Sequence, residues 1–363
     1  MEHLLDPSPA EFGLALASLL AVLGWRMKRG NFLALLIGLG VAVGGGELMA
    51  RALDIGIPVS PPTWEEHYAE PAEPWAYRPS SPLRYRYADN PRGYFDPDNS
   101  VRSSINAEGF RGPLVARHPP KGVTRIAVLG DSFTLGIGVR DADTLPAQLQ
   151  KRISDGGRMV EVLNFGISGS DTARQVELLE KRVLDFNPDV VLIVLFLNDA
   201  ERAYTIPYLS RAAFWKRLRT HSHLLNALIR DVERARLHRR MVDHYREGYR
   251  DEAPGWLNVR DALLHAHALT QARGMQLAIA IYPILVDLDT EYPFADIHRT
   301  IRTFANQAGI ASIDLLDGLR GRRAGDLWVH PSDQHPNEVA QGIAADVLAK
   351  HFDGNRFKAR SPD

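Results

Sequence analysis

The chain has 363 residues, a formal net charge of −1 and no cysteine. This length accommodates one large α/β domain with appendages, and the balanced charge gives no indication of a nucleic-acid partner. The absence of cysteine excludes disulfides, a thiolate nucleophile and sulfur-ligated metals, and it is compatible with a cytoplasmic or a periplasmic location.

Two uncharged and mostly apolar runs stand near the start, at residues 12–25 and 31–46, with the basic stretch RMKR (26–29) between them. Each run has 14 to 16 residues, which is somewhat short of the ~20 residues that span a hydrocarbon core. Polar and aromatic residues at their ends can extend them into the interfaces. Neither run has the polar stripe that a buried helix of a soluble protein usually carries.

We therefore predict that residues 1–52 form a membrane anchor of one or two transmembrane helices. A cleaved signal peptide is the alternative, but its positive region would stand at the start, whereas residues 1–11 are net acidic. The RMKR stretch should remain cytoplasmic under the positive-inside tendency. With one span or two, the chain after about residue 52 is then extracytoplasmic, in the periplasm of a bacterial cell, and membrane lipid is the partner of the anchor.

Residues 53–122 are rich in Pro, Tyr, Arg and Asp and show little periodicity. We interpret this segment as an ordered but irregular lead-in with short strands near residues 83–87 and 103–105. Its glycine-containing run SINAEGFRG (104–112) is consistent with a surface turn, and this interpretation stays open here.

Between residues 123 and 352, apolar segments of strand length alternate with segments of helical length. The predicted strands are 125–129, 160–164, 189–196, 276–282 and 311–315. The predicted helices are 144–154, 172–185, 258–273, 294–308 and 336–351. The strand DVVLIVLF (189–196) is apolar on both faces, as a central parallel strand must be. The alternation predicts a doubly wound parallel sheet in a three-layer α/β/α domain.

Residues 201–257 interrupt this alternation, and residues 353–363 form a polar tail. Nine Arg or Lys residues lie between positions 211 and 240, interleaved with apolar residues. We interpret the interruption as a basic amphipathic helical insertion. It is a solvated helix by default, and the alternatives are a lid over the site or a surface that docks on anionic lipid or polysaccharide.

The first predicted strand ends in a Gly-Asp-Ser turn, within RIAVLGDSFTLGIGV (125–139), and its serine is Ser132. Open α/β sheets bind their ligands at the carboxyl ends of strands, which makes Ser132 a candidate nucleophile. A phosphate-binding loop would end in Gly-Lys-Ser/Thr, which does not occur here. A dinucleotide fingerprint would need a glycine where Asp141 stands, and an aspartyl phosphotransferase would need an aspartate where Phe133 stands.

This turn resembles the first sequence block of the GDSL/SGNH hydrolases, a family of serine esterases and acyl-transferring enzymes. The run SINAEGFRG resembles a segment that precedes the serine block in membrane-anchored members. The resemblance covers about residues 104–351, with 201–257 unmatched. It implies the flavodoxin-like strand order, a histidine base late in the sheet, and oxyanion donors at two other strand ends.

The late stretch HPSDQHPNEVA (330–340) resembles the family's final block. The resemblance implies that His335 takes the proton from Ser132 and that Asp333 orients the imidazole. Many members space this pair as Asp-x-x-His, whereas the spacing here is Asp-x-His. His330 is the rival base, and a histidine that only caps the last helix is the alternative without chemistry.

The resemblance also implies the oxyanion donors. The glycine of block II corresponds to Gly166 in VLNFGISGS, whose backbone N–H would donate, and the asparagine of block III corresponds to Asn198 in VLFLNDA, whose side-chain amide would donate. The N–H of Ser132 would be the third donor. A turn glycine and a strand-end cap are the structural alternatives. Phe196 stands where the family often has glycine, which is a second departure.

Together these features predict a membrane-anchored, extracytoplasmic serine esterase that acts through an acyl-enzyme on an acylated small molecule, lipid or polysaccharide. An O-acetyltransferase of cell-envelope polysaccharide would use the same residues with a sugar hydroxyl in place of water. A non-catalytic envelope-assembly or glycan-binding protein on the same fold is the alternative from another class. No cofactor or metal is implied, because no His, Asp and Glu residues have the spacing of a ligand set.

Overall fold

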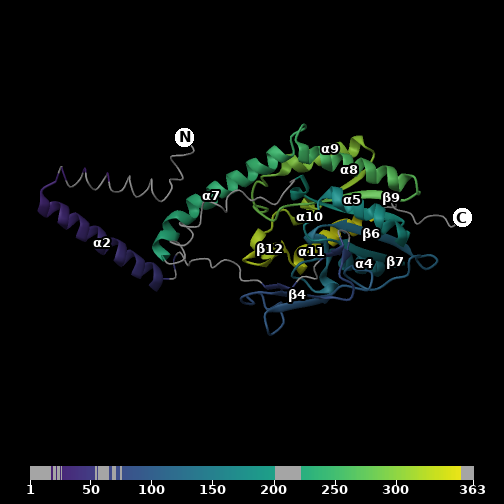
Figure 1. Cartoon of the computed structure of the whole chain (residues 1–363), viewed down its shortest axis with the longest axis horizontal. Coiled ribbons are helices and arrows are strands. Elements are labelled where there is room, and N and C mark those ends of the chain that lie inside the picture. The colour runs from purple at the N-terminus through teal and green to yellow at the C-terminus, as the bar shows by residue number, and fades with distance from the viewer. Residues whose placement is uncertain are drawn as a thin grey trace. The chain divides into compact units, whose positions relative to one another are not determined.

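The structure, a computed structural model, describes residues 18, 22, 25, 27–53, 55, 65–67, 71–73, 76–200 and 222–352 (Figure 1). Most of the first apolar run, residues 201–221 of the basic insertion and the polar tail lie outside the described residues, and the predictions made for them stay predictions. The chain divides into two compact units, residues 1–61 with 205–240 and residues 62–204 with 241–363.

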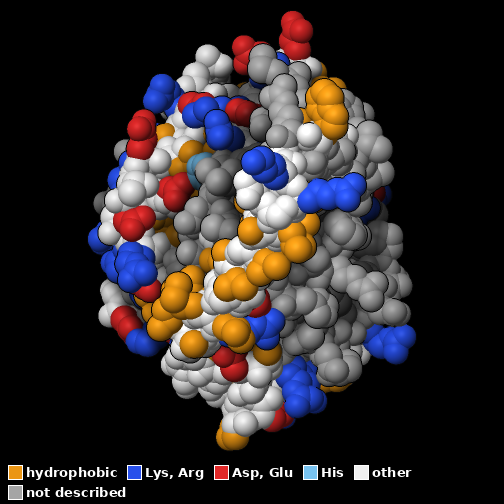
Figure 2. Space-filling model, turned by 90° about the vertical axis from the view of Figure 1, so that its left-hand side faces the viewer, with side chains coloured by type: hydrophobic (Ala, Val, Ile, Leu, Met, Phe, Trp, Pro, Cys, Tyr) orange, Lys and Arg blue, Asp and Glu red, His pale blue; other side chains and the backbone are white. Residues whose placement is uncertain are grey.

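The first unit contains α2 (Arg29–Ala52), a helix of 24 residues. At 1.5 Å per residue it measures about 36 Å, which exceeds a hydrocarbon core of about 30 Å. None of its apolar stretch is buried, and apolar side chains form a band on the face drawn in Figure 2. Among the described residues α2 is the one helix with the length and composition of a membrane span, which suits an anchor or a signal sequence.

The carboxylate of Glu47, in the last turns of α2, accepts hydrogen bonds at the start of α7 (His223–Gly248). Its donors there are the Ser222 hydroxyl at 2.8 Å and the backbone N–H groups of His223 at 3.1 Å and Leu224 at 2.9 Å. A carboxylate at this position satisfies N–H groups that a helix N-terminus leaves unpaired.

A five-stranded parallel sheet is the centre of the second unit. Its strands are β6 (Thr124–Gly130), β7 (Val160–Gly166), β8 (Val190–Phe196), β9 (Gln276–Tyr282) and β10 (Ala311–Asp314). They run in the order β10-β9-β8-β6-β7, which is the flavodoxin-like order. Every residue of β8 is buried, as its apolar sequence on both faces predicts. The predicted fold class and strand order are confirmed.

Helices cover both faces of this sheet, as right-handed crossover connections require. The main helices are α4 (Leu145–Asp155), α5 (Thr172–Lys181), α8 (Pro254–Gln271), α9 (Ala295–Gln307) and α11 (Glu338–His351). Helix α4 packs on α11, and α5 packs on α8; in Figure 1 α8 and α9 lie together on one side of the sheet. The predicted helices are confirmed, with ends that differ by up to four residues.

Short elements complete the second unit. They are α3 (Ser132–Leu135), α10 (Leu316–Leu319), the hairpin β11 (Trp328–His330) with β12 (Asp333–Pro336), and 3₁₀ turns at Asp141–Asp143, Val183–Phe186, Leu197–Ala200 and Ala324–Leu327.

The lead-in belongs to the same unit as the sheet. Its strands are β1 (Glu65–His67), β4 (Pro82–Arg86) and β5 (Ser100–Ser104) in one antiparallel sheet, and β2 (Pro71–Glu73) paired with β3 (Ala76–Tyr77). The strand predicted near 83–87 is confirmed. The strand predicted near 103–105 begins earlier, because residues 100–104 pair along the whole of β4 and Ile105 only bridges to Arg111.

The run SINAEGFRG is more than a surface turn, because it carries a buried arginine. The Arg111 side chain is 1 % exposed and forms an ion pair with Asp141 at 2.8 Å. Its guanidinium also donates to the backbone carbonyls of Leu135 at 2.9 Å and of Val139 at 2.6 Å. Arg111 thus holds the chain that follows the Gly-Asp-Ser turn.

Candidate active site

Ser132 lies at the junction between β6 and α3, where the chain turns sharply. The Asp131 carboxylate accepts the N–H of Phe133 at 2.9 Å and caps the short helix. A Cβ added at Gly130 would lie 2.1 Å from the Thr134 hydroxyl, so only glycine permits this approach. The Gly-Asp-Ser sequence therefore presents Ser132 at the carboxyl end of a buried strand.

The structure brings Ser132, His335 and Asp333 together. His335 Nε2 lies 3.0 Å from Ser132 Oγ, and His335 Nδ1 lies 2.6 Å from Asp333 Oδ1. These contacts have the geometry of a nucleophile, a base and the group that orients the base.

The short Asp-x-His spacing has a structural reason, because both residues lie on strand β12. Residues two apart on a strand point to the same face, so Asp333 reaches the imidazole of His335 directly. A spacing of three residues would suit a helical turn and would place the two side chains on opposite faces of a strand.

Asp333 lies in a buried and hydrogen-bonded environment. Its Oδ2 accepts the hydroxyl of Tyr87 at 2.8 Å, from the lead-in. Burial raises the pKa of the Asp333 carboxyl, but the charge of His335 and the hydrogen bonds from His335 and Tyr87 outweigh burial, and the pKa lies below its usual value. Asp333 is therefore an ionised acceptor at neutral pH.

His330, the rival base, makes contacts of its own. Its Nε2 lies 2.6 Å from an Asp89 carboxylate oxygen, and its Nδ1 lies 2.6 Å from the Ser332 hydroxyl. Both ring nitrogens are thus occupied by groups other than Ser132. This geometry favours His335 as the base.

Asn198 lies in the 3₁₀ turn that follows β8 and is half-buried. Burial raises the pKa of the Asp131 carboxyl to about 6, and hydrogen bonds from Phe133 and Asn198 and the charge of His335 oppose this rise. The Asn198 amide thus faces the Gly-Asp-Ser turn. Its neighbour Phe196 packs on Phe133 with ring centroids 4.1 Å apart.

Asp199 is a second buried carboxyl beside Asp131. Burial and the charge of Asp131 raise the pKa of Asp199 well above its usual value. One of its oxygens accepts the Thr172 hydroxyl at 2.7 Å. Two buried acidic groups to which sequence reasoning gave no role therefore lie near each other, and one of them, Asp131, directly precedes Ser132 in the chain.

Gly166 makes a contact that bears on its predicted role as an oxyanion donor. Its N–H donates to the Asn164 side chain at 2.9 Å, and a Cβ at this position would lie 2.2 Å from the Leu135 nitrogen. The N–H is thus committed within β7, which argues against Gly166 as an oxyanion donor. Its glycine is needed for close packing against α3.

Gly169, three residues later, has the free N–H that Gly166 lacks. It is exposed, has φ of 72° and makes no backbone hydrogen bond among the described residues. The Ser170 hydroxyl and the Ile167 N–H both contact the Gly130 carbonyl, which holds this turn beside the end of β6. The sequence signal for Gly169 was its place as the second glycine of VLNFGISGS.

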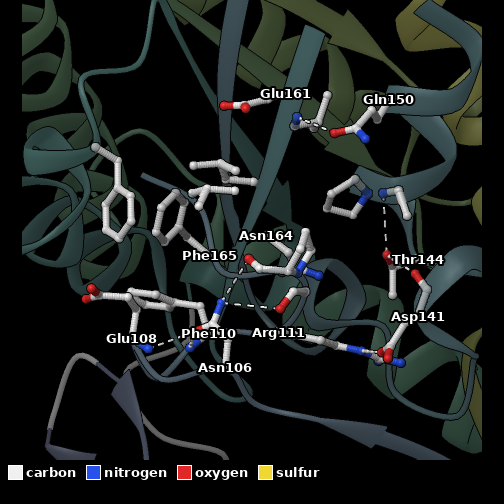
Figure 3. Close-up of a pocket in the computed structure, with 18 of the residues that line it drawn as sticks. Asn106, Glu108, Phe110, Arg111, Asp141, Thr144, Gln150, Glu161, Asn164 and Phe165 are labelled. Atoms are coloured by element: carbon white, nitrogen blue, oxygen red, sulfur yellow. Dashed lines mark hydrogen bonds and ion pairs between the residues drawn. The ribbon is translucent and has the colours of Figure 1, made fainter. Parts of the chain in front are cut away.

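A cavity of about 440 Å³ lies apart from these residues, between the lead-in and the free edge of β7. Figure 3 shows Phe110 and Phe165 on one side and Thr144 and Gln150 on the other. Its lining includes none of Ser132, His335 and Asp333. No three His, Asp or Glu residues in the described part of the chain cluster as metal ligands.

Among curated proteins, the chain is similar to an acetylxylan esterase of Xylanibacter ruminicola and an arylesterase of Vibrio mimicus. The first match is 37 % identical over 91 residues and covers 23 % of this chain and 18 % of the relative. The second is 32 % identical over 80 residues and covers 22 % of this chain and 40 % of the relative. The matches thus span less than half the length of either relative.

Solved structures with a similar course include TesA and an acetylxylan esterase from Geobacillus stearothermophilus, Axe2. The TesA structure has 18 % identity and a TM-score of 0.41, with 63 % of this chain and 98 % of that chain covered. The Axe2 structure has 16 % identity and a TM-score of 0.42, with 67 % and 100 % covered. The model of the GDSL-like lipase/acylhydrolase family matches residues 128–342, more than half of the sequence, and the chain therefore belongs to this family.

Proposed function

We propose that this protein is a serine esterase that hydrolyses an ester through an acyl-enzyme. The observation that carries the proposal is the aligned set of Ser132 Oγ, His335 and Asp333, with contacts of 3.0 and 2.6 Å. The family membership of residues 128–342 supports acyl chemistry at this site.

In the first step Ser132 Oγ attacks the ester carbonyl carbon and its proton passes to His335 Nε2. The tetrahedral intermediate collapses, the C–O bond to the alcohol breaks, and His335 returns the proton to the leaving alcohol. In the second step His335 takes a proton from water, the hydroxide attacks the acyl-enzyme, and the proton returns to Ser132 as the acid leaves. Asp333 remains ionised and holds Nδ1–H throughout.

The developing oxyanion needs donors that are not already committed. The N–H of Ser132 makes no backbone hydrogen bond among the described residues, and the Asn198 amide has a second N–H besides the one that the Asp131 carboxylate accepts. We assign these two groups and the N–H of Gly169 as the donors, with Gly169 in place of Gly166. Each such donor is worth about 10²–10³ in rate in serine hydrolases.

The substrate we propose is an ester with a small acyl group. Phe196 and Phe133 pack together beside the turn, and Phe133 also lies 5.6 Å from the ring of His335. Aromatic side chains at this place leave little width for a long acyl chain. One curated relative is named for acetylxylan, whose acyl group is acetyl.

We further propose that α2 anchors the enzyme in the cytoplasmic membrane with the site outside the cytoplasm. The basic residues that precede α2 support this orientation. Fusion of alkaline phosphatase after residue 60 should give an active reporter in a bacterial host. An inactive phosphatase, with an active cytoplasmic reporter at the same place, would reverse the orientation.

The test of the activity is turnover of p-nitrophenyl acetate by the full chain in detergent micelles, beside Ser132→Ala and Ser332→Ala. Loss of the nucleophile should lower kcat by about 10³–10⁶. Ser332→Ala should retain the rate, because that hydroxyl contacts His330. A fluorophosphonate label should attach to the parent and to Ser332→Ala only.

A parent without turnover or label would reject the esterase, and so would turnover that survives Ser132→Ala. Addition of a soluble glycan distinguishes the two activities that this site could have, ester hydrolysis and acyl transfer. Acyl transfer to the glycan in excess of hydrolysis would identify an acyltransferase, whereas a rate indifferent to the glycan identifies the hydrolase.

A further inference from the structure

We propose that Tyr87, a lead-in residue outside the family match, is a positioning residue of the active site that acts through Asp333. The inference rests on the proposed function of Ser132, His335 and Asp333. It adds that the catalytic machinery is completed by a segment that precedes the hydrolase sequence blocks. The contact joins residues 246 positions apart in the chain.

The hydrogen bonds of Asp333 are divided between its two carboxylate oxygens. Oδ1 lies 2.6 Å from Nδ1 of His335 and accepts the backbone N–H of the same residue at 3.1 Å. Oδ2 accepts the Tyr87 hydroxyl at 2.8 Å. The carboxylate plane is therefore fixed from both ends, and it cannot turn without losing a hydrogen bond.

Tyr87 is itself held rigidly. Its side chain is buried and stacks on Phe95, with ring centroids 4.5 Å apart. It also stacks on the ring of His330, with centroids 5.3 Å apart. Its hydroxyl approaches Gly138 so closely that a Cβ there would lie 2.5 Å from the oxygen. These contacts fix the Tyr87 ring and thereby hold its hydroxyl beside Asp333.

This support has a structural need. Asp333 and His335 both lie on β12, a strand of four residues in a two-stranded hairpin. Short hairpins have little stability of their own. The hydroxyl of Tyr87 ties this hairpin to the lead-in sheet and fixes the orientation of the acceptor, in the way that outer hydrogen bonds hold a productive geometry.

The hydroxyl also tunes the acid–base behaviour of the pair. Asp333 on β12 and Asp131 at the end of β6 both interact with the charge of His335, and the His330–Asp89 pair lies beyond Tyr87. A carboxylate that loses a donor directs more of its charge to the imidazolium and stabilises it. Without Tyr87, protonated His335 would persist to higher pH.

Tyr87→Phe removes the hydroxyl and retains the ring. We expect kcat/KM to fall about tenfold, as for loss of one hydrogen bond to a charged group. The acid limb of the kcat/KM profile, which reports protonation of the base, should move to higher pH. Tyr94→Phe is the matched control, since this lead-in hydroxyl binds Asp143 at 2.5 Å instead.

A double-mutant cycle separates positioning from simple stability. In an Asp333→Ala background Tyr87→Phe should have no further effect on kcat/KM, because its acceptor is gone. An equal loss in both backgrounds would overturn the inference, as would an unchanged rate and pH profile in Tyr87→Phe. Either result would leave the Ser132-dependent esterase intact.

A measurement without turnover keeps the inference independent of the substrate. The titration of the His335 imidazole can be followed by NMR in the full chain labelled with ¹⁵N-histidine, with His335→Gln for assignment. The titration should move to higher pH in Tyr87→Phe and stay in place in Tyr94→Phe. An unmoved titration in Tyr87→Phe would reject the inference even if the parent turned over no ester.

Discussion

The second unit contains two histidine–aspartate pairs with nearly the same local geometry. His335 Nδ1 lies 2.6 Å from Asp333, and His298 Nδ1 lies 2.8 Å from Asp314. A tyrosine hydroxyl belongs to each set: Tyr87 contacts the aspartate of the first, and the second tyrosine contacts the histidine.

The two pairs differ in what the other ring nitrogen meets and in access to solvent. His335 Nε2 faces the Ser132 hydroxyl at 3.0 Å, and the His335 side chain is 23 % exposed. His298 Nε2 faces the Tyr292 hydroxyl at 3.5 Å, and the His298 side chain is 2 % exposed. The comparison teaches that, under the proposed function, the outward nitrogen decides whether a histidine–aspartate pair can act as a base. The His298–Asp314 pair has no nucleophile at this nitrogen, and its role is to join α9 to β10.

The sharpest way to break this comparison is to remove each histidine. His335→Ala should lower kcat/KM by about 10⁴–10⁶ because Ser132 loses its base. His298→Ala should instead lower the free energy of unfolding by about 1.5–3 kcal/mol, since the buried Asp314 carboxylate loses its contact with the imidazole at 2.8 Å. Ester turnover and thermal unfolding of both variants in detergent measure the two effects.

The assignment of the pairs would be reversed by the opposite pattern. A His298→Ala variant that folds like the parent but loses turnover would place His298 in the chemistry. A His335→Ala variant with parental turnover would remove His335 from it.

The aspartates should divide in the same way, with a smaller effect on rate. Asp333→Asn should lower kcat by about 10³–10⁴, because an amide can hold the wrong tautomer of His335. Asp314→Asn should leave kcat within about twofold and destabilise the fold, since the contact with His298 Nδ1 at 2.8 Å loses its charged acceptor, while the amide oxygen can still accept the Leu316 N–H. A similar fall in kcat for both variants would show that the two pairs are not distinct in function.

The strands of the sheet and the positions of Ser132 and His335 could be predicted, because each has a signal in the local sequence. Buried parallel strands are apolar runs, and all five strands of the sheet were predicted within two residues at either end. Ser132 follows such a run directly, and His335 lies in a short motif before the last helix. These features depend on neighbours in sequence, which a pattern can report.

Contacts between distant segments could not be predicted in this way. No spacing relates Tyr87 to Asp333, and the prediction for the lead-in went no further than short strands. Gly166 and Gly169 stand in the same motif, and the proposal of Gly169 as the donor depends on the Asn164 side chain, which accepts the N–H of Gly166. The Asp-x-His spacing departs from the family pattern in sequence. The structure explains it, because Asp333 and His335 lie on strand β12 and point to the same face.

A buried carboxyl distinguishes the His335 set further, and it gives a pH dependence to stability. Burial raises the pKa of Asp131 to about 6, from an ordinary 3.8. The native state therefore binds this proton more tightly than the unfolded chain. The contribution of Asp131 to stability is complete below about pH 4 and is lost as the pH rises through about 6.

Asp131→Asn should remove this loss of stability at higher pH, because asparagine carries no charge. Its side-chain oxygen can still accept the Phe133 N–H. Relative to the parent, the variant should gain up to about 3 kcal/mol in the free energy of unfolding between pH 4 and pH 7.5. Urea unfolding at both pH values measures the gain. Asp143→Asn on the half-buried turn before α4 is the control and should follow the parent, and parallel curves for Asp131→Asn would contradict the prediction.

The smallest expected effect lies in the tyrosine of the second set. Burial raises the pKa of Tyr292, so its hydroxyl stays protonated, and it accepts the Ile284 N–H at 2.9 Å. Tyr292→Phe leaves this N–H and the outward nitrogen of His298 without a partner, and it should lower the free energy of unfolding by about 1–2 kcal/mol. Its kcat/KM and pH profile should equal those of the parent, in contrast to Tyr87→Phe. A shifted acid limb in Tyr292→Phe would mean that the two sets are coupled, whereas a shift confined to Tyr87→Phe ties the acid–base chemistry to the His335 set alone.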